Sequence, residues 1–290
     1  MKNNFRTDLA TEARDLWQKG SGRSLPGLVT GREERQGFPM DVVEIRTKGT
    51  AKSLCKPVGR YVTMELGALL RREEDAFPRA CAVLAEELRR QLALAPGAEV
   101  LVVGLGNPDI TPDAVGPLAA EAVLATRHLR RQLPEEFGAF RPVSVFRSGV
   151  LGTTGVESAA LTAAVVEKVR PAAVIAIDAL AAGDPARLCR SVQITDAGIV
   201  PGSGVGNARS AMTAETLGVP VVAVGVPTVV DARTLCAALT GTAPEMEEDL
   251  FVTPRDIDRR VRDTARLVGY AVDLALQEGM TVADVDMFLS

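Results

Sequence analysis

Histidine is nearly absent from this chain, since His128 is the only one among 290 residues. Zinc sites of the HExxH kind need two histidines, so a histidine-rich zinc centre is excluded. A Ser-His-Asp or Cys-His arrangement would have to use His128. That residue falls inside a predicted helix at 114–133, where it is more simply interpreted as a packed helix residue. A carboxylate-rich metal site is left open.

Cysteine pairs, long apolar runs and an excess of one charge are missing as well. No stretch approaches the roughly 18 to 20 apolar residues that cross a bilayer, and the first residues lack the apolar core of a signal peptide. We therefore expect no membrane partner and a cytoplasmic location. With 33 Lys and Arg against 37 Asp and Glu, the net charge of −4 argues against direct binding of nucleic acid. The cysteines form no CxxC pair, so we expect all four to be reduced: Cys55, Cys81, Cys189 and Cys236.

The pattern of apolar residues changes near residue 98. Residues 9–97 form an N-terminal extension with a Gly/Pro/Arg-rich loop at 20–37, short strands at 40–46 and 60–66, and a helix at 80–94. From 98 to 290, unbroken Val/Ile/Ala runs alternate with helical segments, as in a parallel sheet buried on both faces. The sequence thus predicts a single α/β domain, with a mostly parallel central sheet flanked by helices and a small β-containing extension.

Helices are expected between these runs and at the end of the chain. The predicted spans are 114–133, 156–169, 230–239 and 254–278, the last with Thr253 as N-cap and Pro254 at its first position.

Four segments follow apolar runs and are candidates for the site, because ligands of open parallel sheets bind beyond the carboxyl ends of strands. They are residues 104–113, 177–184, 195–207 and 225–231. The first begins Gly104-Leu105-Gly106, but Asp109 occupies the third position of a GxGxxG fingerprint, where pyrophosphate would approach. A nucleotide site is therefore disfavoured.

Two aspartates in these segments form a candidate catalytic pair. Asp113 follows Thr111-Pro112 as N-cap and first helical residue, so the helix dipole should lower its pKa. Asp178 follows an entirely apolar run, so desolvation should raise its pKa. Two carboxylates shifted in opposite directions suit a hydrolase of the aspartic type. Alternatively, Asp113 only caps a helix and Asp178 only holds a loop, and spacing alone does not decide.

Substrate contacts are expected from polar and glycine-rich positions in the same segments. The loop at 201–207 could present successive main-chain N–H groups to a substrate carbonyl or an anion, or be a flexible surface turn. The candidate substrate-binding residues are Asn107, Ser203, Gly204, Gly206 and Asn207.

Several segments resemble the germination protease family and follow its order along nearly the whole chain. They are RTDLATEA (6–13), GLGNPDITPDAVGPLA (104–119), TRHL (126–129), RPVS (141–144), GVLGTTGVE (149–157), VIAIDALAA (174–182), PGSGVGNAR (201–209), TLGVPVVAVGVPTVVDA (216–232) and VTPRDID (252–258). The resemblance implies catalytic roles for Asp113 and Asp178, no cofactor and no metal. It also implies a sandwich fold like that of hydrogenase maturation proteases, which bind a metal, so a metal-assisted peptidase is the second hypothesis and a non-catalytic, nucleotide-sensing module the third.

The resemblance further implies an endopeptidase of the forespore and spore core that cuts small acid-soluble spore proteins after an acidic residue. Such enzymes are made as zymogens that cut themselves, and Thr7-Asp8-Leu9-Ala10-Thr11 looks like a substrate, which predicts a propeptide at 1–8 and autocleavage between Asp8 and Leu9. The alternative is that Asp8 caps a helix starting near Leu9. A homotetramer is also implied, although only residues 240–251 stand where longer relatives carry an extra segment.

Overall fold

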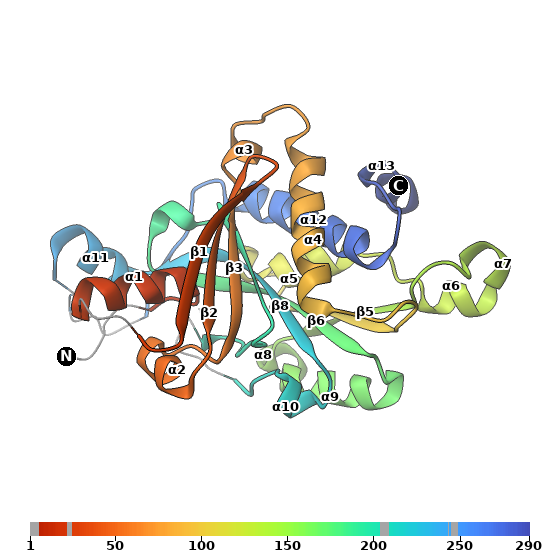
Figure 1. The fold of residues 1–290 in the computed structure, drawn as a ribbon, viewed down its shortest axis with the longest axis horizontal. Helices are drawn as coiled ribbons and strands as arrows, with labels where there is room; N and C mark the ends of the chain where they lie inside the picture. Colours follow the sequence, from red (N-terminus) through yellow and green to blue (C-terminus); the bar gives the residue numbers. More distant parts are fainter. Residues whose placement is uncertain (1–5, 22–24, 204–208, 243, 245–248) are drawn as a thin grey trace.

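The structure is a computed structural model that describes residues 6–21, 25–203, 209–242, 244 and 249–290. Within these residues, one nine-stranded sheet has the order β1-β2-β3-β7-β8-β6-β4-β5, and β9 pairs with β8 (Figure 1). Helices lie on both sides of this sheet, so the predicted α/β class is confirmed. The strands are β1 (Leu28–Arg35), β2 (Phe38–Ile45), β3 (Gly59–Glu65), β4 (Val100–Leu105), β5 (Val143–Gly149), β6 (Ala173–Ala182), β7 (Ser191–Thr195), β8 (Val221–Asp231) and β9 (Phe251–Val252).

Parallel pairing joins β5, β4, β6 and β8. Every residue of β4 is buried, and β6 and β8 are buried at all but one position each. This agrees with the expectation that unbroken apolar runs mark strands covered on both faces. The pairing of β4 with β6 ends at Gly104 and Ile177, whereas β6 and β8 pair as far as Ala182 and Val230. One edge of β6 is therefore not covered by β4 beyond Ile177.

The N-terminal extension continues this sheet through β7, which lies antiparallel between β3 and β8. Strands β2 and β3 lie within one or two residues of their predicted positions. Strand β1 was not expected, because its sequence LVTGREER falls in the predicted loop at 20–37 and is too polar to show an apolar face. Its backbone instead pairs along its whole length with β2, at the edge of the sheet.

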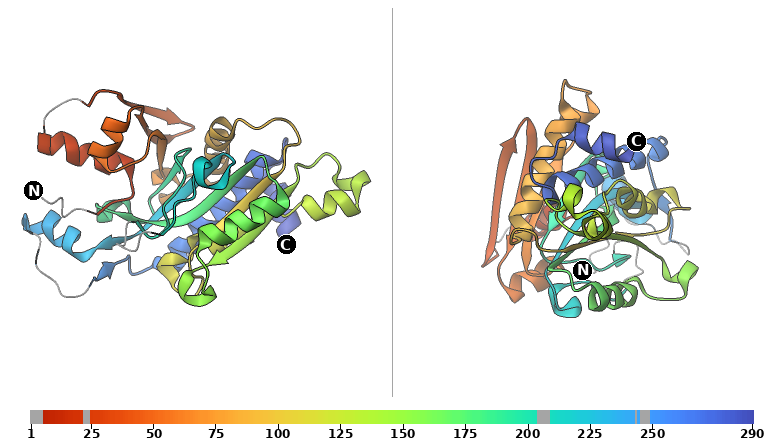
Figure 2. Two further views of the ribbon diagram at one scale, coloured as in Figure 1. Left: turned by 90° about the horizontal axis from the view of Figure 1, so that it is seen from below. Right: turned by 90° about the vertical axis from the view of Figure 1, so that its right-hand side faces the viewer.

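The helices form a layer on each face of the sheet (Figure 2). Helices α4, α5 and α12 pack with Val100 and Val102 of β4 on one face, while α9 and α10 pack with Leu101 and Val103 on the other. The helices are α1 (Ala10–Ser21), α2 (Lys48–Leu54), α3 (Gly67–Leu70), α4 (Ala76–Leu92), α5 (Val115–Glu121), α6 (Arg127–Gln132), α7 (Pro134–Phe137), α8 (Leu151–Thr154), α9 (Ser158–Val169), α10 (Ala214–Leu217), α11 (Ala232–Thr240), α12 (Ile257–Leu276) and α13 (Val282–Leu289), with 3-10 turns η1 (Thr111–Asp113) and η2 (Pro185–Arg187).

Three helix predictions were wrong in their bounds, and the first is the helix expected at 80–94, because α4 begins four residues earlier and ends two residues earlier. The single helix expected at 114–133 is broken between α5 and α6, because the Leu124 N–H donates to Asp273 Oδ1 (3.0 Å) and Thr126 Oγ1 bonds the main chain near β5. Helix α12 begins three residues later than expected, and Thr253 does not cap it. Its hydroxyl donates to the Thr228 carbonyl oxygen (3.0 Å).

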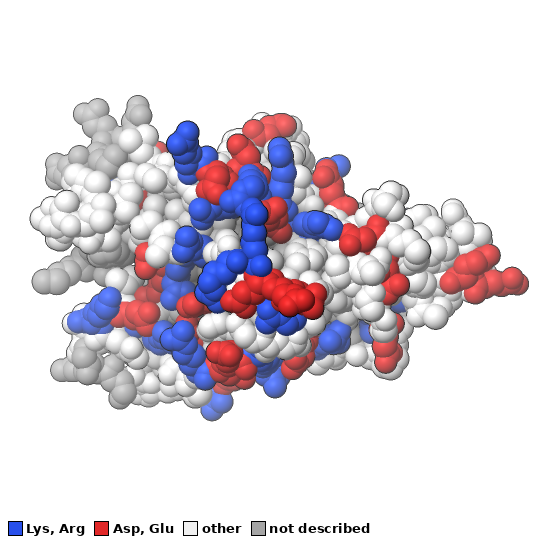
Figure 3. Space-filling view, turned by 90° about the horizontal axis from the view of Figure 1, so that it is seen from above, with Lys and Arg blue, Asp and Glu red and all other residues white. Residues whose placement is uncertain are grey.

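The surface matches the small net charge. Basic and acidic side chains are interspersed on the face seen in Figure 3. Among the described residues, no helix is long and apolar enough to span a membrane.

Candidate active site

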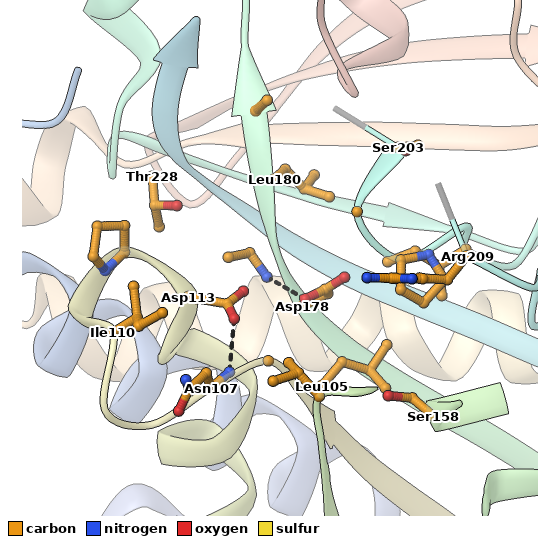
Figure 4. A pocket seen from close by; sticks show the side chains of 18 of the residues that line it. Leu105, Asn107, Ile110, Asp113, Ser158, Asp178, Leu180, Ser203, Arg209 and Thr228 are labelled. Carbon is orange, nitrogen blue, oxygen red and sulfur yellow. Dashed lines mark hydrogen bonds between the residues drawn. The ribbon is translucent and has the colours of Figure 1, made fainter. Parts of the chain in front are cut away.

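A cavity of about 570 Å³ lies beyond the end of β4, beside the part of β6 that β4 leaves uncovered (Figure 4). The ends of four segments line it: residues 105–113, 150–158, 178–181 and 199–203. Thr228 and Val229 of β8, Asp8, Arg209 and Phe251 complete the wall. Of the segments expected from the sequence to be loops, 177–184 and 225–231 are largely strand, since β6 and β8 continue to pair with each other as far as Ala182 and Val230.

Asp178 lies within β6 at the point where pairing with β4 has just ended, and the residue is only 5% exposed. Its Oδ1 accepts a hydrogen bond from the Ala179 N–H (2.9 Å). Burial raises the pKa of Asp178 well above the ordinary value, and the nearby charges of Asp113 and Asp8 raise it further. The predicted direction is confirmed, because a buried carboxyl is more stable in its neutral form.

Asp113 ends the 3-10 turn η1, in which Pro112 occupies an early position. The Asn107 N–H donates to Asp113 Oδ2 (2.7 Å), and Gly106 passes so close that a Cβ there would lie 2.1 Å from the Asp113 carbonyl oxygen. The predicted low pKa was wrong: burial raises the pKa of Asp113, and the Asn107 hydrogen bond offsets this only in part. The Thr111 hydroxyl, expected as a cap, donates to Asp258 instead (2.8 Å).

The two carboxyl groups face the same cavity from η1 and β6, as Figure 4 shows. Asp113 is near enough to raise the pKa of Asp178 by charge repulsion. Such a pair prefers to share one proton, because two neighbouring negative charges in a buried site repel each other. Asp178 is the more buried partner and therefore the better proton carrier. The arrangement supplies one carboxylate as a base and one carboxylic acid as a proton donor.

The chain's own residue Asp8 lies against the uncovered edge of β6. Its N–H donates to the Ala181 carbonyl oxygen (2.8 Å), and the Ala181 N–H donates to Asp8 Oδ2 (2.9 Å). The Ser203 hydroxyl donates to Asp8 Oδ1 (2.7 Å). Both carboxylate oxygens thus have donors outside α1, which weakens the alternative that Asp8 serves as the cap of that helix.

The residues that follow Asp8 are buried. Leu9 is 0% exposed and packs with Leu180, Leu188 and Val230. Gln193 spans the bond between Asp8 and Leu9: its Nε2 donates to the Asp8 carbonyl oxygen (3.3 Å) and its Oε1 accepts from the Ala10 N–H (2.8 Å). The segment is therefore fixed on both sides of this peptide bond.

The remaining predicted residues fall in different places. The Asn107 backbone binds Asp113, while its side-chain Oδ1 accepts from the Asp109 N–H (3.0 Å). Gly204, Gly206 and Asn207 lie outside the described residues. His128 lies near the start of α6 with an exposed side chain, so it is not the packed helix residue that was expected.

Four residues around the site were not singled out by sequence reasoning. Lys56 Nζ donates to the Thr7 carbonyl oxygen (2.9 Å), and Glu12 accepts from Thr7 Oγ1 and from the Gly183 N–H (2.6 Å). Gln193 lies in the short apolar strand β7, where a single polar residue was the available signal. Thr228 was inside a candidate segment and is fully buried with a hydroxyl that has no partner in the described structure.

The described residues contain no group of three or more His, Cys, Asp or Glu side chains placed to hold a metal ion. In the described part of the chain, no third side chain of these types is therefore placed to bind a metal ion together with Asp113 and Asp178.

Known proteins resemble this chain over most of its length. A family model described as germination protease matches residues 6–242. The germination protease of Caldanaerobacter subterraneus subsp. tengcongensis is 39% identical, over 98% of this chain and 98% of that protein. That of Clostridium perfringens is 34% identical over 99% of each chain, and that of Priestia megaterium is 44% identical over 78% of this chain and 64% of its own.

Among solved structures, a NiFe hydrogenase maturation protease from Thermococcus kodakarensis KOD1 is 19% identical and covers 60% of this chain and 92% of its own, with a TM-score of 0.35. That value is too low to carry an argument about this protein. The family model and the relatives that match nearly end to end are decisive, and the chain belongs to the germination protease family.

Proposed function

We propose that this germination protease is an aspartic-type endopeptidase that cuts small acid-soluble spore proteins after an acidic residue. The observation that carries the proposal is the meeting of Asp113, Asp178 and the substrate-like residue Asp8 in one cavity. Membership of the germination protease family supports the peptidase class. The two carboxyl groups and the bound acidic residue support the finer assignment.

In this mechanism, Asp113 is the general base and Asp178 the general acid. Asp113 takes a proton from a water molecule while the water oxygen attacks the carbonyl carbon of the residue before the cut. At the same time, Asp178 donates its proton to the carbonyl oxygen. The tetrahedral intermediate then breaks at the C–N bond, the proton held by Asp113 passes to the leaving amine, and one hydroxyl of the intermediate returns its proton to Asp178 as the carbonyl group re-forms. The assignment rests on burial: Asp178 has the more strongly raised pKa, and the Asn107 N–H favours the charged form of Asp113.

The same site acts on the chain itself. Residues 1–8 form a propeptide that is removed by cleavage between Asp8 and Leu9, leaving residues 9–290 as one peptidase domain. The bonds of Asp8 to Ala181 and Ser203, and the bracketing of the next peptide bond by Gln193, support this. We further propose that the enzyme works in the forespore and spore core, without a cofactor, as a homotetramer.

The test is self-cleavage of the full-length chain in the presence of a chelator, monitored by the intact mass of the protein. We expect the parent to lose residues 1–8, and Asp113→Asn and Asp178→Asn to remain full length while folded, because an amide keeps the shape of the side chain without its proton chemistry. Asp109→Asn is the matched control, since Asp109 is exposed and belongs to the same loop. Processing of Asp178→Asn at the parent rate contradicts its catalytic role, and loss of processing with chelator alone favours the metal-assisted alternative.

A further inference from the structure

The uncovered edge of β6 offers main-chain groups to an extended peptide. Pairing of β6 with β4 ends at Ile177, and further along the strand the N–H and C=O groups of Ala181 point toward the uncovered side, where both bond Asp8. Ala181 bonds both the main chain and the side chain of Asp8 (2.8 and 2.9 Å). A main-chain donor of a buried strand is held rigidly, so it can recognise an acceptor without further ordering.

A second donor completes the contact with the acidic side chain. The Ser203 hydroxyl reaches Asp8 Oδ1 at 2.7 Å, while the Ala181 N–H holds Oδ2. An asparagine in place of Asp8 has one acceptor oxygen and an NH2 group that can only donate. Its oxygen could still accept from the Ala181 N–H and its NH2 group could donate to the Ser203 hydroxyl oxygen, but neither bond would then be charge-assisted, and charge-assisted hydrogen bonds are roughly twice as strong as neutral ones.

Positive charge lies next to this contact. The Lys56 ammonium is bound to the Thr7 carbonyl oxygen (2.9 Å), one residue before Asp8. Burial lowers the pKa of Lys56, and the nearby negative charges of Asp8 and Glu12 oppose that shift. The charges of Lys56 and Asp8 are thus near enough to interact, which favours an acidic residue over a neutral one at this position.

We propose that the Ala181 N–H and the Ser203 hydroxyl form the acid subsite, the pair of donors that selects the acidic residue before the cut. This rests on the proposed function, because it takes Asp8 as the substrate residue. Lys56 adds favourable charge, and Gln193 is a positioning residue that fixes the peptide on both sides of the bond. Ser203 is therefore a specificity-determining residue rather than a catalytic one.

The test is a double-mutant cycle on self-cleavage of the full-length chain, with Ser203→Ala and Asp8→Asn made singly and together. Loss of a hydrogen bond to a charged group should slow cleavage by about tenfold when Asp8 is present, at the low end of the usual range because the Ser203–Asp8 bond is exposed to solvent. In the Asp8→Asn chain, Ser203→Ala should change the already slow rate by less than about threefold. Ser53→Ala is the matched control, because the Ser53 hydroxyl donates to the Gly49 carbonyl oxygen of its own exposed helix turn. Independent, multiplicative effects of the two substitutions overturn the proposal.

A second readout separates this proposal from the proposed function. The same cycle in an Asp178→Asn background is followed by hydrogen exchange of the amides of residues 9–12, which report release of the bound segment. Ser203→Ala should speed this exchange by about tenfold with Asp8 present and by less than about threefold in the Asp8→Asn chain. A parent that never self-cleaves refutes the proposed function, and the exchange cycle then still decides whether Ser203 recognises the carboxylate.

Discussion

Leu9→Ala should release the N-terminal segment from the site without unfolding the protein. Leu9 is 0% exposed and packs with Leu180, Leu188 and Val230, so the change removes a fully buried side chain and leaves a cavity. Such substitutions cost about 2 to 5 kcal/mol. At about 1.4 kcal/mol per factor of ten, the bound segment should be released roughly 30-fold to several thousand-fold more often.

Hydrogen exchange in an Asp178→Asn background measures this release, because that variant is expected to keep residues 1–8 attached. The amides of α1 should exchange faster in Leu9→Ala by the factor above, whereas amides of β4 and β6 in the core should keep their parent rates. Leu239→Ala is the matched control, since Leu239 is 76% exposed and should cost no more than about 0.5 kcal/mol. Equal acceleration in α1 and in the core would refute the reasoning, because Leu9 would then stabilise the whole fold rather than the docking of one segment.

Two further changes test the site and its support. Burial raises the pKa of Asp273 to about 8, so between pH 5 and 7 the folded state holds a proton that the unfolded state has already released near pH 4. The free energy of unfolding should therefore fall by about 1.4 kcal/mol for each unit that the pH rises in this range, from this group alone. Urea unfolding of Asp273→Asn should lack that slope, and an unchanged slope would show that Asp273 is ionised in the fold. Gly106→Ala should remain folded but lose self-cleavage, because its φ of +110° is strained for alanine and the new Cβ would displace the Asp113 main chain. Gly49→Ala, with open space around its Cα, is the control, and full activity of Gly106→Ala would mean that Asp113 tolerates displacement.

The sequence was sufficient to locate the carboxylate pair but not to describe its surroundings. Asp113 and Asp178 were found because each follows an apolar run, and the ends of β4 and β6 meet at one edge of the sheet. The pKa of Asp113 was predicted in the wrong direction, since burial by distant segments outweighs the local helix end. A helix start can be predicted from neighbouring residues, whereas the burial of Asp113 depends on a cavity formed by residues more than a hundred positions apart in the sequence.

The peptide-binding side of the site could not be predicted for the same reason. Asp8 contacts Ala181 and Ser203 across most of the chain, and Gln193 gave no signal beyond one polar residue in β7. The uncovered edge of β6 depends on where β4 stops, which the sequence did not indicate because β6 continues as an apolar run past Asp178. Strand β1 was missed because edge strands exposed on both faces do not need apolar residues.

The central claim is that Asp113 and Asp178 cut a peptide after an acidic residue without a metal. Its most direct test is cleavage, in the presence of a chelator, of a peptide containing Thr-Asp-Leu-Ala-Thr by a chain that starts at Leu9, beside the same chain with Asp178→Asn. The account predicts a single cut between Asp and Leu by the parent and none by the variant. Cleavage by both proteins, or by neither until a metal is restored, would contradict it.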